Sequence, residues 1–285
     1  MKIGYVCTNF NNSSFTVSAV NSLLANAGHE VFSVIVDNGS DDANRDILRD
    51  LAAFSPSIHV IFSPENVGYF RGLNLGIRHL RTSHPDIDWM VIGNNDLEFP
   101  SDFVERLQQH VAKWEQYPVI SPDIITIDGC HQNPHVISHI SGIRELVYDI
   151  YFSNYYVGLL TQKLALALHR FSDRRDEEQW ATPQAIHQGH GSCYILGPVF
   201  FDHFEELWAP TFLMSEEFFL AKQLMGIDAQ VYYDPAIQVT HHWHGAVGRL
   251  PNRRRWELSR SAHIEYRKYV KPFVWPSNRP TSPSP

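Results

Sequence analysis

The sequence predicts an α/β protein whose central sheet is mostly parallel and flanked by helices. Over residues 1–100, short runs rich in β-branched residues alternate with longer segments that carry apolar residues at helical spacing. This alternation is typical of βαβ units. Each short run ends in polar residues. Because parallel strands end at the same edge of a sheet, these polar segments are expected to meet at one ligand-binding edge.

The elements of this first part follow from the spacing of the apolar residues. Strands are predicted at residues 3–7, 31–36, 59–62 and 89–92. Helices are predicted at residues 16–27, 43–54 and 72–80. The polar loops at the carboxyl ends of the strands are residues 8–12, 37–42, 66–74 and 94–98.

The second part is less regular. Helices are predicted at residues 103–114 and 155–168, a strand at 119–122, and a solvated helix face or loop at the charged run 172–178. We interpret residues 1–100 and 101–248 as two halves of a single merged domain. Residues 249–285 are interpreted as a basic helical tail with a Pro- and Ser-rich end that is expected to be disordered.

Composition and charge exclude several classes of protein. The formal net charge of −8 over 285 residues argues against a nucleic-acid partner. The three cysteines are widely spaced, which indicates neither a disulfide framework nor a thiolate zinc site and fits a reducing cytoplasm. The apolar N-terminal run is too short for a signal peptide, and no later run is long and apolar enough to span a bilayer. A cytoplasmic protein is expected.

The strand at residues 89–92 leads into Gly93 and then Asn94, Asn95 and Asp96. Hard cations such as Mg²⁺ are commonly held at such strand ends by one or two carboxylates together with substrate phosphates. Asp96 is therefore the leading metal-ligand candidate. The alternative is a polar turn, because Asn and Asp favour turns through local backbone hydrogen bonds.

Two other strand ends carry similar signals. Asp37 begins a D-N-G-S-D-D run that would either contact a nucleobase or ribose or form a turn that starts the next helix. Residues 66–76 are rich in glycine and precede a helix, an arrangement that allows the backbone to approach a ligand and offers N–H groups to an anion. The segment is neither a Walker loop nor a G-x-G-x-x-G motif.

The order of these segments resembles the inverting nucleotide-sugar glycosyltransferases of family 2, which have the GT-A fold. That family opens with a strand and a polar turn, here Thr8-Asn9. Its V-D-N-G-S-x-D motif is matched by residues 36–42, its E-N-x-G-x-x-x-G-x-N-x-G segment by residues 65–76, and its N-x-D strand end by residues 94–96.

The resemblance implies roles for these residues. Asp37 would contact the base, and Asp96 would bind Mg²⁺ or Mn²⁺. The donor would be a UDP- or dTDP-linked sugar. The remaining residues expected at the donor pocket are Thr8, Asn9, Asn66, Gly68, Tyr69, Arg71, Gly72, Asn74, Asn94 and Asn95.

The second half resembles the family more loosely. Residues 213–219 are similar to its F-x-Y-E-D-x-D-L signature, but Glu216-Glu217 replaces the usual Glu-Asp, and Phe219 stands where a later Asp is expected. The resemblance places the catalytic base at Glu217, and Glu216 would then hold an acceptor hydroxyl. The alternative is that both carboxylates stabilise a helix N-terminus through its dipole.

Residues 234–245 resemble the closing strand and histidine of the family, which can complete the metal shell. His241 is the first choice and His242 the second. His242 and His244 would share one face of an extended strand, so a zinc site is an alternative, although no further ligand is evident nearby.

By this resemblance the chain is a metal-dependent inverting enzyme that transfers a hexosyl or deoxyhexosyl group to a glycan or lipid-linked acceptor. Within the family it looks most like bacterial enzymes of capsule or O-antigen synthesis, including rhamnosyltransferases. The basic tail leads to the hypothesis of peripheral attachment to an anionic membrane at the inner face of the plasma membrane, with a solvated terminal helix as the alternative. The rival functions are a sugar nucleotidyltransferase and a non-catalytic nucleotide- or sugar-binding protein.

Overall fold

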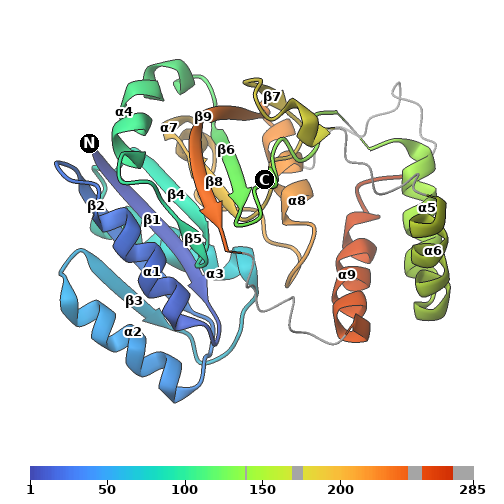
Figure 1. Ribbon diagram of the computed structural model, residues 1–285, viewed down its shortest axis with the longest axis horizontal. Coiled ribbons are helices and arrows are strands. Elements are labelled where there is room, and N and C mark those ends of the chain that lie inside the picture. The colour runs from blue at the N-terminus through green and yellow to red at the C-terminus, as the bar shows by residue number, and fades with distance from the viewer. Residues whose placement is uncertain (139, 169–175, 243–251, 272–285) are drawn as a thin grey trace.

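The computed structural model describes residues 1–138, 140–168, 176–242 and 252–271. Within these residues, nine strands form one sheet in the order β3-β2-β1-β4-β8-β6-β9-β5, with β7 paired to β9 (Figure 1). Helices cover both faces of this sheet. The predicted α/β class with a mostly parallel central sheet is confirmed.

The first half of the sheet is parallel throughout. It comprises β1 (Lys2–Asn9), β2 (Glu30–Asp37), β3 (Ile58–Phe62) and β4 (Trp89–Asn94), with β1 paired to both β2 and β4. The helices between them are α1 (Ser13–Leu24), α2 (Asp42–Phe54) and α3 (Tyr69–Ser83). All four strands and all three helices predicted here are present, with shifts of a few residues at the helix ends.

The two ends of α3 show why these bounds shift. The predicted helix began at residue 72, whereas α3 begins at Tyr69, directly after Gly68. Gly68 has φ +96°, a backbone conformation that residues with a Cβ rarely adopt. It ends the preceding extended segment, and the helix starts at the next residue. The helix also continues to Ser83, beyond the last residue of the apolar spacing.

The second half adds antiparallel strands. Its elements are β5 (Leu97–Glu98), α4 (Phe103–Trp114), β6 (Val119–Thr126), β7 (Gln184–Ile186), β8 (Cys193–Leu196), α7 (Pro198–His203), α8 (Glu216–Met225) and β9 (Val231–His241). Strand β8 runs antiparallel to both β4 and β6, whereas β6 and β9 are parallel. Strand β6 continues to Thr126 and is longer than the strand predicted at residues 119–122. Strand β8 joins the two parallel parts into one sheet.

The core lies on both faces of the sheet, and β1 shows how. Ile3, Tyr5 and Cys7 pack on the face covered by α1, α2 and α4, whereas Val6 packs on the face covered by α3, α7 and α8. Successive side chains of a strand point to opposite faces, so a strand buried on both sides must be apolar throughout. This explains the continuous apolar runs in the sequence.

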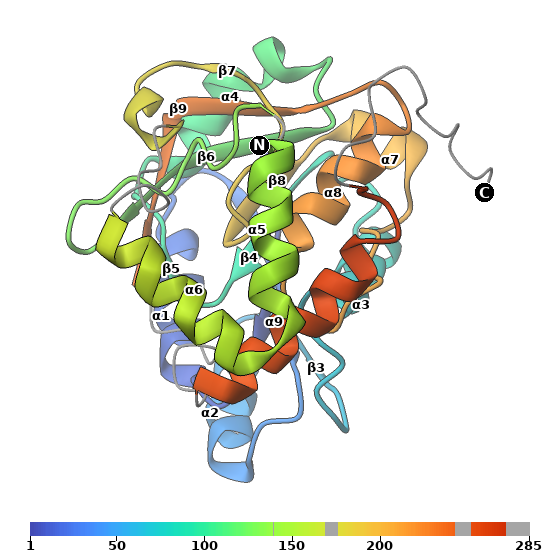
Figure 2. The same ribbon diagram turned by 90° about the vertical axis from the view of Figure 1, so that its right-hand side faces the viewer.

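The described residues include three further helices and one short turn. They are α5 (Gly142–Ser153), α6 (Tyr155–Leu168), the 3₁₀ turn η1 (Asp176–Gln179) and α9 (Asn252–Tyr266). Figure 1 shows α5, α6 and α9 beside one another, and Figure 2 shows the same helices from that side. In the part of the chain that the structure describes, no helix is both long and apolar enough to cross a bilayer.

Polar contacts hold α9 against α5. Glu145 is 3% exposed, accepts a hydrogen bond from the Tyr266 hydroxyl, and lies 2.7 Å from Arg267 Nη1. Asp149 lies 2.9 Å from His263 Nε2 and 2.6 Å from Arg267 Nε. The predicted tail helix is thus present, and part of its basic charge serves to bind α5. The Pro- and Ser-rich end, residues 172–175 of the charged run, and His244 lie outside the described residues.

Candidate functional site

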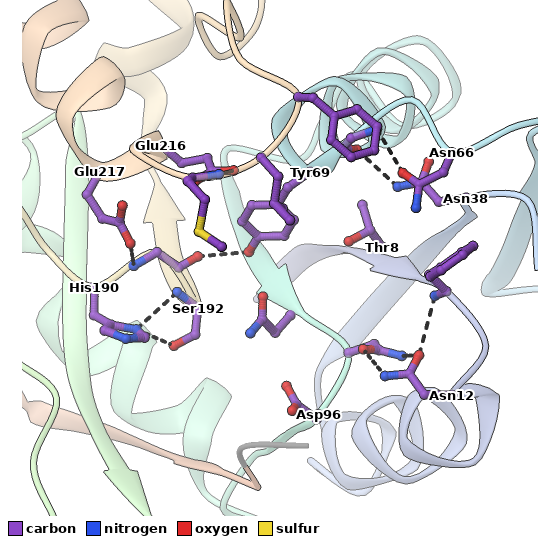
Figure 3. Close-up of a pocket in the computed structure, with 18 residues that line it drawn as sticks. Thr8, Asn12, Asn38, Asn66, Tyr69, Asp96, His190, Ser192, Glu216 and Glu217 are labelled. Carbon is purple, nitrogen blue, oxygen red and sulfur yellow. Dashed lines mark hydrogen bonds between the residues drawn. The ribbon is translucent and has the colours of Figure 1, made fainter. Parts of the chain in front are cut away.

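A cavity of about 290 Å³ opens at the carboxyl ends of β1 and β4. Figure 3 shows Asn38 and Asn66 on one side of it and Glu217 with His190 on the other. Its walls come from the ends of β1, β2 and β4, the start of α3, the turn before β8 and the loop before α8. The lining residues are Thr8, Phe10, Asn12, Asn38, Asn66, Gly68, Tyr69, Asn94, Asn95, Asp96, His190, Gly191, Ser192, Phe212, Leu213, Met214, Glu216 and Glu217.

Buried amide side chains join the ends of β1 and β4 beneath the cavity. Asn95 Nδ2 donates to Asn12 Oδ1 at 2.8 Å, to Thr16 Oγ1 at 2.7 Å and to Asn9 Oδ1 at 3.1 Å. Asn12 Nδ2 donates back to Asn95 Oδ1 at 3.2 Å. A buried network whose members are all hydrogen-bonded is rigid. Asn95 is therefore held in one orientation directly before Asp96, while Asn9, which bonds it, is not among the lining residues.

Asp37 lies beside the cavity and is completely buried. Its Oδ1 accepts from Asn9 Nδ2 at 3.1 Å, and its Oδ2 accepts from the Ser40 N–H at 3.2 Å and from Arg45 Nε at 2.9 Å. Both carboxylate oxygens are thus occupied by protein donors. The neighbouring Asn38 lines the cavity in its place, and its Nδ2 donates to the Gly68 carbonyl at 3.0 Å.

The glycine-rich segment contributes its first residues to the cavity. A Cβ on Gly68 would lie 2.1 Å from the Phe212 carbonyl oxygen, so only glycine fits there. Because of this close approach, the Tyr69 N–H donates to the same carbonyl at 3.0 Å. The Tyr69 hydroxyl donates to the Gly191 carbonyl at 2.8 Å and so connects the start of α3 to the turn before β8. Asn66, Gly68 and Tyr69 therefore line the cavity.

The later residues of the segment lie outside the cavity and hold its frame. Arg71 Nε donates to the Ala209 carbonyl at 3.1 Å. Asn74 bonds both backbone groups of Leu207, donating to its carbonyl at 2.7 Å and accepting from its N–H at 2.9 Å. Gly72 packs closely against Thr8 and Asn38. These contacts attach α3 to β1 and to the loop that leads to α8.

Asp96 and His241 come together although they are far apart in sequence. Strand β5 pairs with β9, with Leu97 opposite His241, and the His242 N–H donates to the Asp96 carbonyl at 2.9 Å. As a result, His241 Nε2 lies 3.2 Å from Asp96 Oδ1. His242 points elsewhere, with its Nε2 2.8 Å from Glu98 Oε2.

The tautomer of His241 follows from its partners. Nδ1 lies 2.7 Å from Gln132 Oε1, which can only accept, so Nδ1 carries the proton. In the neutral ring the lone pair is then on Nε2, which lies 3.2 Å from Asn94 Nδ2 and 3.2 Å from Asp96 Oδ1. A nitrogen lone pair beside a carboxylate oxygen, with the other ring nitrogen hydrogen-bonded, is the arrangement of a metal-binding histidine.

A divalent cation fits this donor set. Among the described residues, no three His, Cys, Asp or Glu side chains converge as a metal cage. Mg²⁺ and related cations do not require such a cage, because they are usually held by one or two protein ligands, water and substrate phosphates. Asp96 and His241 would supply two ligands to such a cation.

Glu216 and Glu217 begin helix α8, but their environments differ. Glu217 Oε1 accepts from the Gly191 N–H at 3.2 Å, and its side chain is half-buried. Glu216 is 8% exposed, and its Oε1 accepts from the Met214 N–H at 2.8 Å. Burial and the nearby charge of Glu217 raise the pKa of Glu216 from 4.5 to about 8. Glu216 therefore holds its proton to higher pH than an ordinary glutamic acid.

Glu216→Gln is expected to gain stability relative to the wild type as pH rises. Between pH 4.5 and about 8, the unfolded chain releases the Glu216 proton while the folded protein retains it. The stability contributed by protonated Glu216 is thus fully present below pH 4.5 and lost as pH rises through about 8. Urea unfolding across this range measures the effect. The control is Glu178→Gln at an exposed position; parallel curves for the wild type and Glu216→Gln would contradict the expectation.

Several lining residues were not singled out from the sequence. His190 and Ser192 are among them: both line the cavity, and His190 Nδ1 lies 2.9 Å from Ser192 Oγ. Gly191 between them is the one sequence feature that indicates a close approach at this turn. In the structure, a Cβ at this position would lie 2.7 Å from Glu217 Oε1. Phe212 carries no sequence signal, since its place depends on the approach of Gly68.

The sequence profile described as Glycosyl transferase family 2 matches residues 6–159, which is more than half of the chain. An uncharacterized glycosyltransferase of Nostoc sp. (strain PCC 7120 / SAG 25.82 / UTEX 2576) is 36% identical over 77 residues. That match covers 27% of this chain and 24% of the relative.

Solved structures of glycosyltransferases share the fold. The mannosyltransferase PcManGT from Pyrobaculum calidifontis, in complex with GDP-Man and Mn²⁺, has a TM-score of 0.54 and 13% identity over 95% of this chain and 65% of its own. GalNAc-T7, with UDP, GalNAc and Mn²⁺, has a TM-score of 0.53 and 11% identity over 85% of this chain and 44% of its own. The chain thus spans less than two thirds of each of these proteins. At such identities the likeness is one of fold, and it confirms the expected GT-A type.

Proposed function

This chain belongs to glycosyl transferase family 2, and on that premise we propose that it transfers a sugar from a nucleoside-diphosphate sugar to a glycan or lipid-linked acceptor with inversion. The observation that carries the proposal is a single cavity lined by Asp96 at the end of β4 and by Glu217 at the start of α8. Residues 1–100 would bind the nucleotide, and residues 101–248 would bind the acceptor and provide the base.

The donor would bind along the ends of β1, β2 and β4. Thr8, Asn66, Asn94 and Asn95 offer polar groups to it from the cavity wall. Asp37 would affect binding of the nucleobase mainly by holding the end of β2 in place. The next residue, Asn38, lines the cavity. A UDP- or dTDP-linked sugar is the proposed donor.

Asp96 and His241 would hold Mg²⁺ or Mn²⁺ at the diphosphate. When bound, the cation would supply positive charge to the departing diphosphate. The chain prepares this position with the Gln132 hydrogen bond, which leaves His241 Nε2 directed toward Asp96. The presence of Mn²⁺ in the two structural neighbours supports the choice of metal.

Glu217 is the proposed base. The acceptor oxygen forms a bond to the anomeric carbon, the acceptor proton passes to Glu217, and the bond from that carbon to the diphosphate oxygen breaks with its electron pair on the diphosphate. A general base must be ionised, and the raised pKa of Glu216 disfavours that carboxyl for the role near neutral pH. Protonated Glu216 would instead hold an acceptor hydroxyl or the loop around Met214.

Peripheral attachment to an anionic membrane is proposed as well, in keeping with capsule or O-antigen synthesis on a lipid-linked acceptor. Exposed apolar side chains repeat at helical spacing on α5 and α6; they are Ile143, Leu146, Ile150, Tyr156, Leu160 and Leu164. The exposed Arg253, Arg254 and Arg255 lie on the neighbouring α9. Apolar helix faces together with basic residues favour an anionic bilayer surface. Co-sedimentation with phosphatidylglycerol vesicles at low salt is expected; its absence would contradict the proposal.

Thermal unfolding with UDP, GDP, dTDP and their sugars, each with and without Mn²⁺, tests the proposed function. A ligand that binds only the folded state raises its stability, so one nucleotide with Mn²⁺ is expected to give the largest shift. Release of nucleoside diphosphate in the presence of acceptor would support transfer. Release of pyrophosphate would point to a nucleotidyltransferase, and binding without any release to a non-catalytic protein.

A further inference from the structure

A second cavity, of about 370 Å³, lies between the α5–α6 hairpin and α9. Met214 lines both this cavity and the first one. The two spaces therefore meet at the loop that precedes Glu216 and Glu217. The residues that line the second cavity are Tyr151, Tyr155, Leu159, Gln162, Met214, Asn252, Arg255, Trp256 and Ser259.

The backbone at this junction is strained. Met214 has φ +77° and Ser215 has φ +66°, and neither residue is glycine. Left-handed conformations of such residues cost free energy and persist where the surrounding structure holds them. Here the Glu216 carboxyl accepts from the Met214 N–H, and the Thr211 hydroxyl donates to the Met214 carbonyl at 3.1 Å. These contacts hold the loop in a defined conformation where the two cavities adjoin.

Packing also fixes α9 relative to the carboxylates. The rings of Phe218 on α8 and Tyr266 on α9 lie 4.3 Å apart at 69°, an edge-to-face contact. Phe218 directly follows Glu217 on the same helix. The wall of the second cavity that α9 provides is therefore attached to the helix that carries the proposed base.

The lining of the second cavity is aromatic with a few polar groups. Trp256 and Tyr155 form an edge-to-face pair with ring centroids 5.6 Å apart, and Trp256 Nε1 donates to the Tyr151 carbonyl at 3.2 Å. A Cβ added at Gly158 would lie 2.8 Å from Trp256 Nε1, so α6 packs directly against the indole ring. These contacts hold the aromatic rings in place before any ligand binds.

The polar groups of this lining are amides, a hydroxyl and one guanidinium. Gln162, Asn252 and Ser259 can each donate and accept hydrogen bonds, and Arg255 is the one charged residue among the described residues that line the cavity. No carboxylate is among them. Rigid aromatic surfaces with a few directed hydrogen-bonding groups suit a ligand with apolar faces and hydroxyl edges, and the guanidinium excludes a cationic one.

We propose that this second cavity binds the acceptor saccharide, with its reactive hydroxyl passing Met214 toward Glu217. The proposal rests on the proposed function, because it names the substrate class of the same reaction. The saccharide is neutral or acidic, since Arg255 would interact with a hydroxyl, carboxylate or phosphate. The bonds that form and break are those already given for transfer, with the acceptor proton passing to Glu217.

The test places a tryptophan side chain in the second cavity and compares this variant with the same substitution at the adjacent leucine. Leu159 lines the cavity, whereas Leu160 on the same helix is 58% exposed and does not. Leu159→Trp is expected to weaken saccharide binding at least tenfold, and Leu160→Trp to leave it unchanged. Saturation-transfer NMR with a panel of neutral and acidic p-nitrophenyl glycosides measures binding. Ser259→Trp fills the cavity from α9 and is the second variant should Leu159→Trp fail to fold.

The donor reactions separate the two proposals. Leu159→Trp is expected to keep the nucleotide-induced thermal shift and slow donor hydrolysis of the wild type while losing acceptor-dependent release of nucleoside diphosphate. Equal saccharide binding by Leu159→Trp and the wild type, or no binding by the wild type, overturns the acceptor cavity and leaves the donor site supported. A wild type with no nucleotide effect overturns the proposed function and the acceptor role together.

Discussion

Glu217→Gln is expected to lower the rate of sugar transfer by about 10²–10⁴-fold, the usual contribution of a positioned general base. The amide keeps the size of the side chain and can still accept from the Gly191 N–H, which the carboxylate does at 3.2 Å. It cannot take a proton from the acceptor. The nucleotide-induced thermal shift should therefore stay, while acceptor-dependent release of nucleoside diphosphate is lost.

Matched variants make this test specific to the base. Glu217→Asp restores the residue type that the family usually has here but shortens the side chain, so it should fall between Glu217→Gln and the wild type. Glu206→Gln, at a position where the side chain is 45% exposed, is the control for loss of a carboxylate. Transfer by Glu217→Gln at the wild-type rate would move the role of base away from this residue.

Asp96→Ala is expected to abolish both the Mn²⁺-dependent part of the nucleotide thermal shift and transfer. A metal at the departing diphosphate contributes several kcal/mol of charge stabilisation, so the expected loss of rate is at least about a hundredfold. The variant removes the carboxylate that lies 3.2 Å from His241 Nε2 and leaves the Gln132 hydrogen bond of that histidine in place. Calorimetric titration of Mn²⁺ in the presence of nucleoside diphosphate measures the effect.

Glu98→Ala is the control for this experiment. Glu98 lies two residues after Asp96, on strand β5, but its side chain is 58% exposed and lies beside His242. Metal-dependent nucleotide binding should be unchanged in that variant. Full activity of Asp96→Ala would exclude a metal role for this carboxylate, whatever the outcome for Glu217.

The motifs indicated much of the candidate site because most of its polar residues follow strands or precede helices. Asn94 ends an apolar strand, Asn95 and Asp96 follow it, and Glu216 and Glu217 begin a helix. Parallel strands bring such residues to one edge, so spacing along the sequence was sufficient to group them. The order of the segments then indicated the family.

Other properties depended on contacts that no local pattern encodes. Asp37 stood at a strand end like Asp96, yet the structure encloses its carboxylate with Asn9, Ser40 and Arg45. His241 and His242 were hard to separate by sequence, and the pairing of β5 with β9 directs the first toward Asp96 and the second toward Glu98. Alternation along a strand sends neighbours to opposite faces, but only the partner strand decides which face meets the cavity.

By itself, the sequence determined the α/β class, the order of its strands and helices in the first half, and the residue types at the edge of the sheet. These properties are local, since apolar periodicity and turn-forming residues act over a few positions. The tertiary structure alone decided which carboxylates are enclosed, that the pKa of Glu216 is raised, and that a second aromatic cavity adjoins the first at Met214. Burial and pKa depend on groups brought together from distant parts of the chain, so they follow from packing and not from spacing.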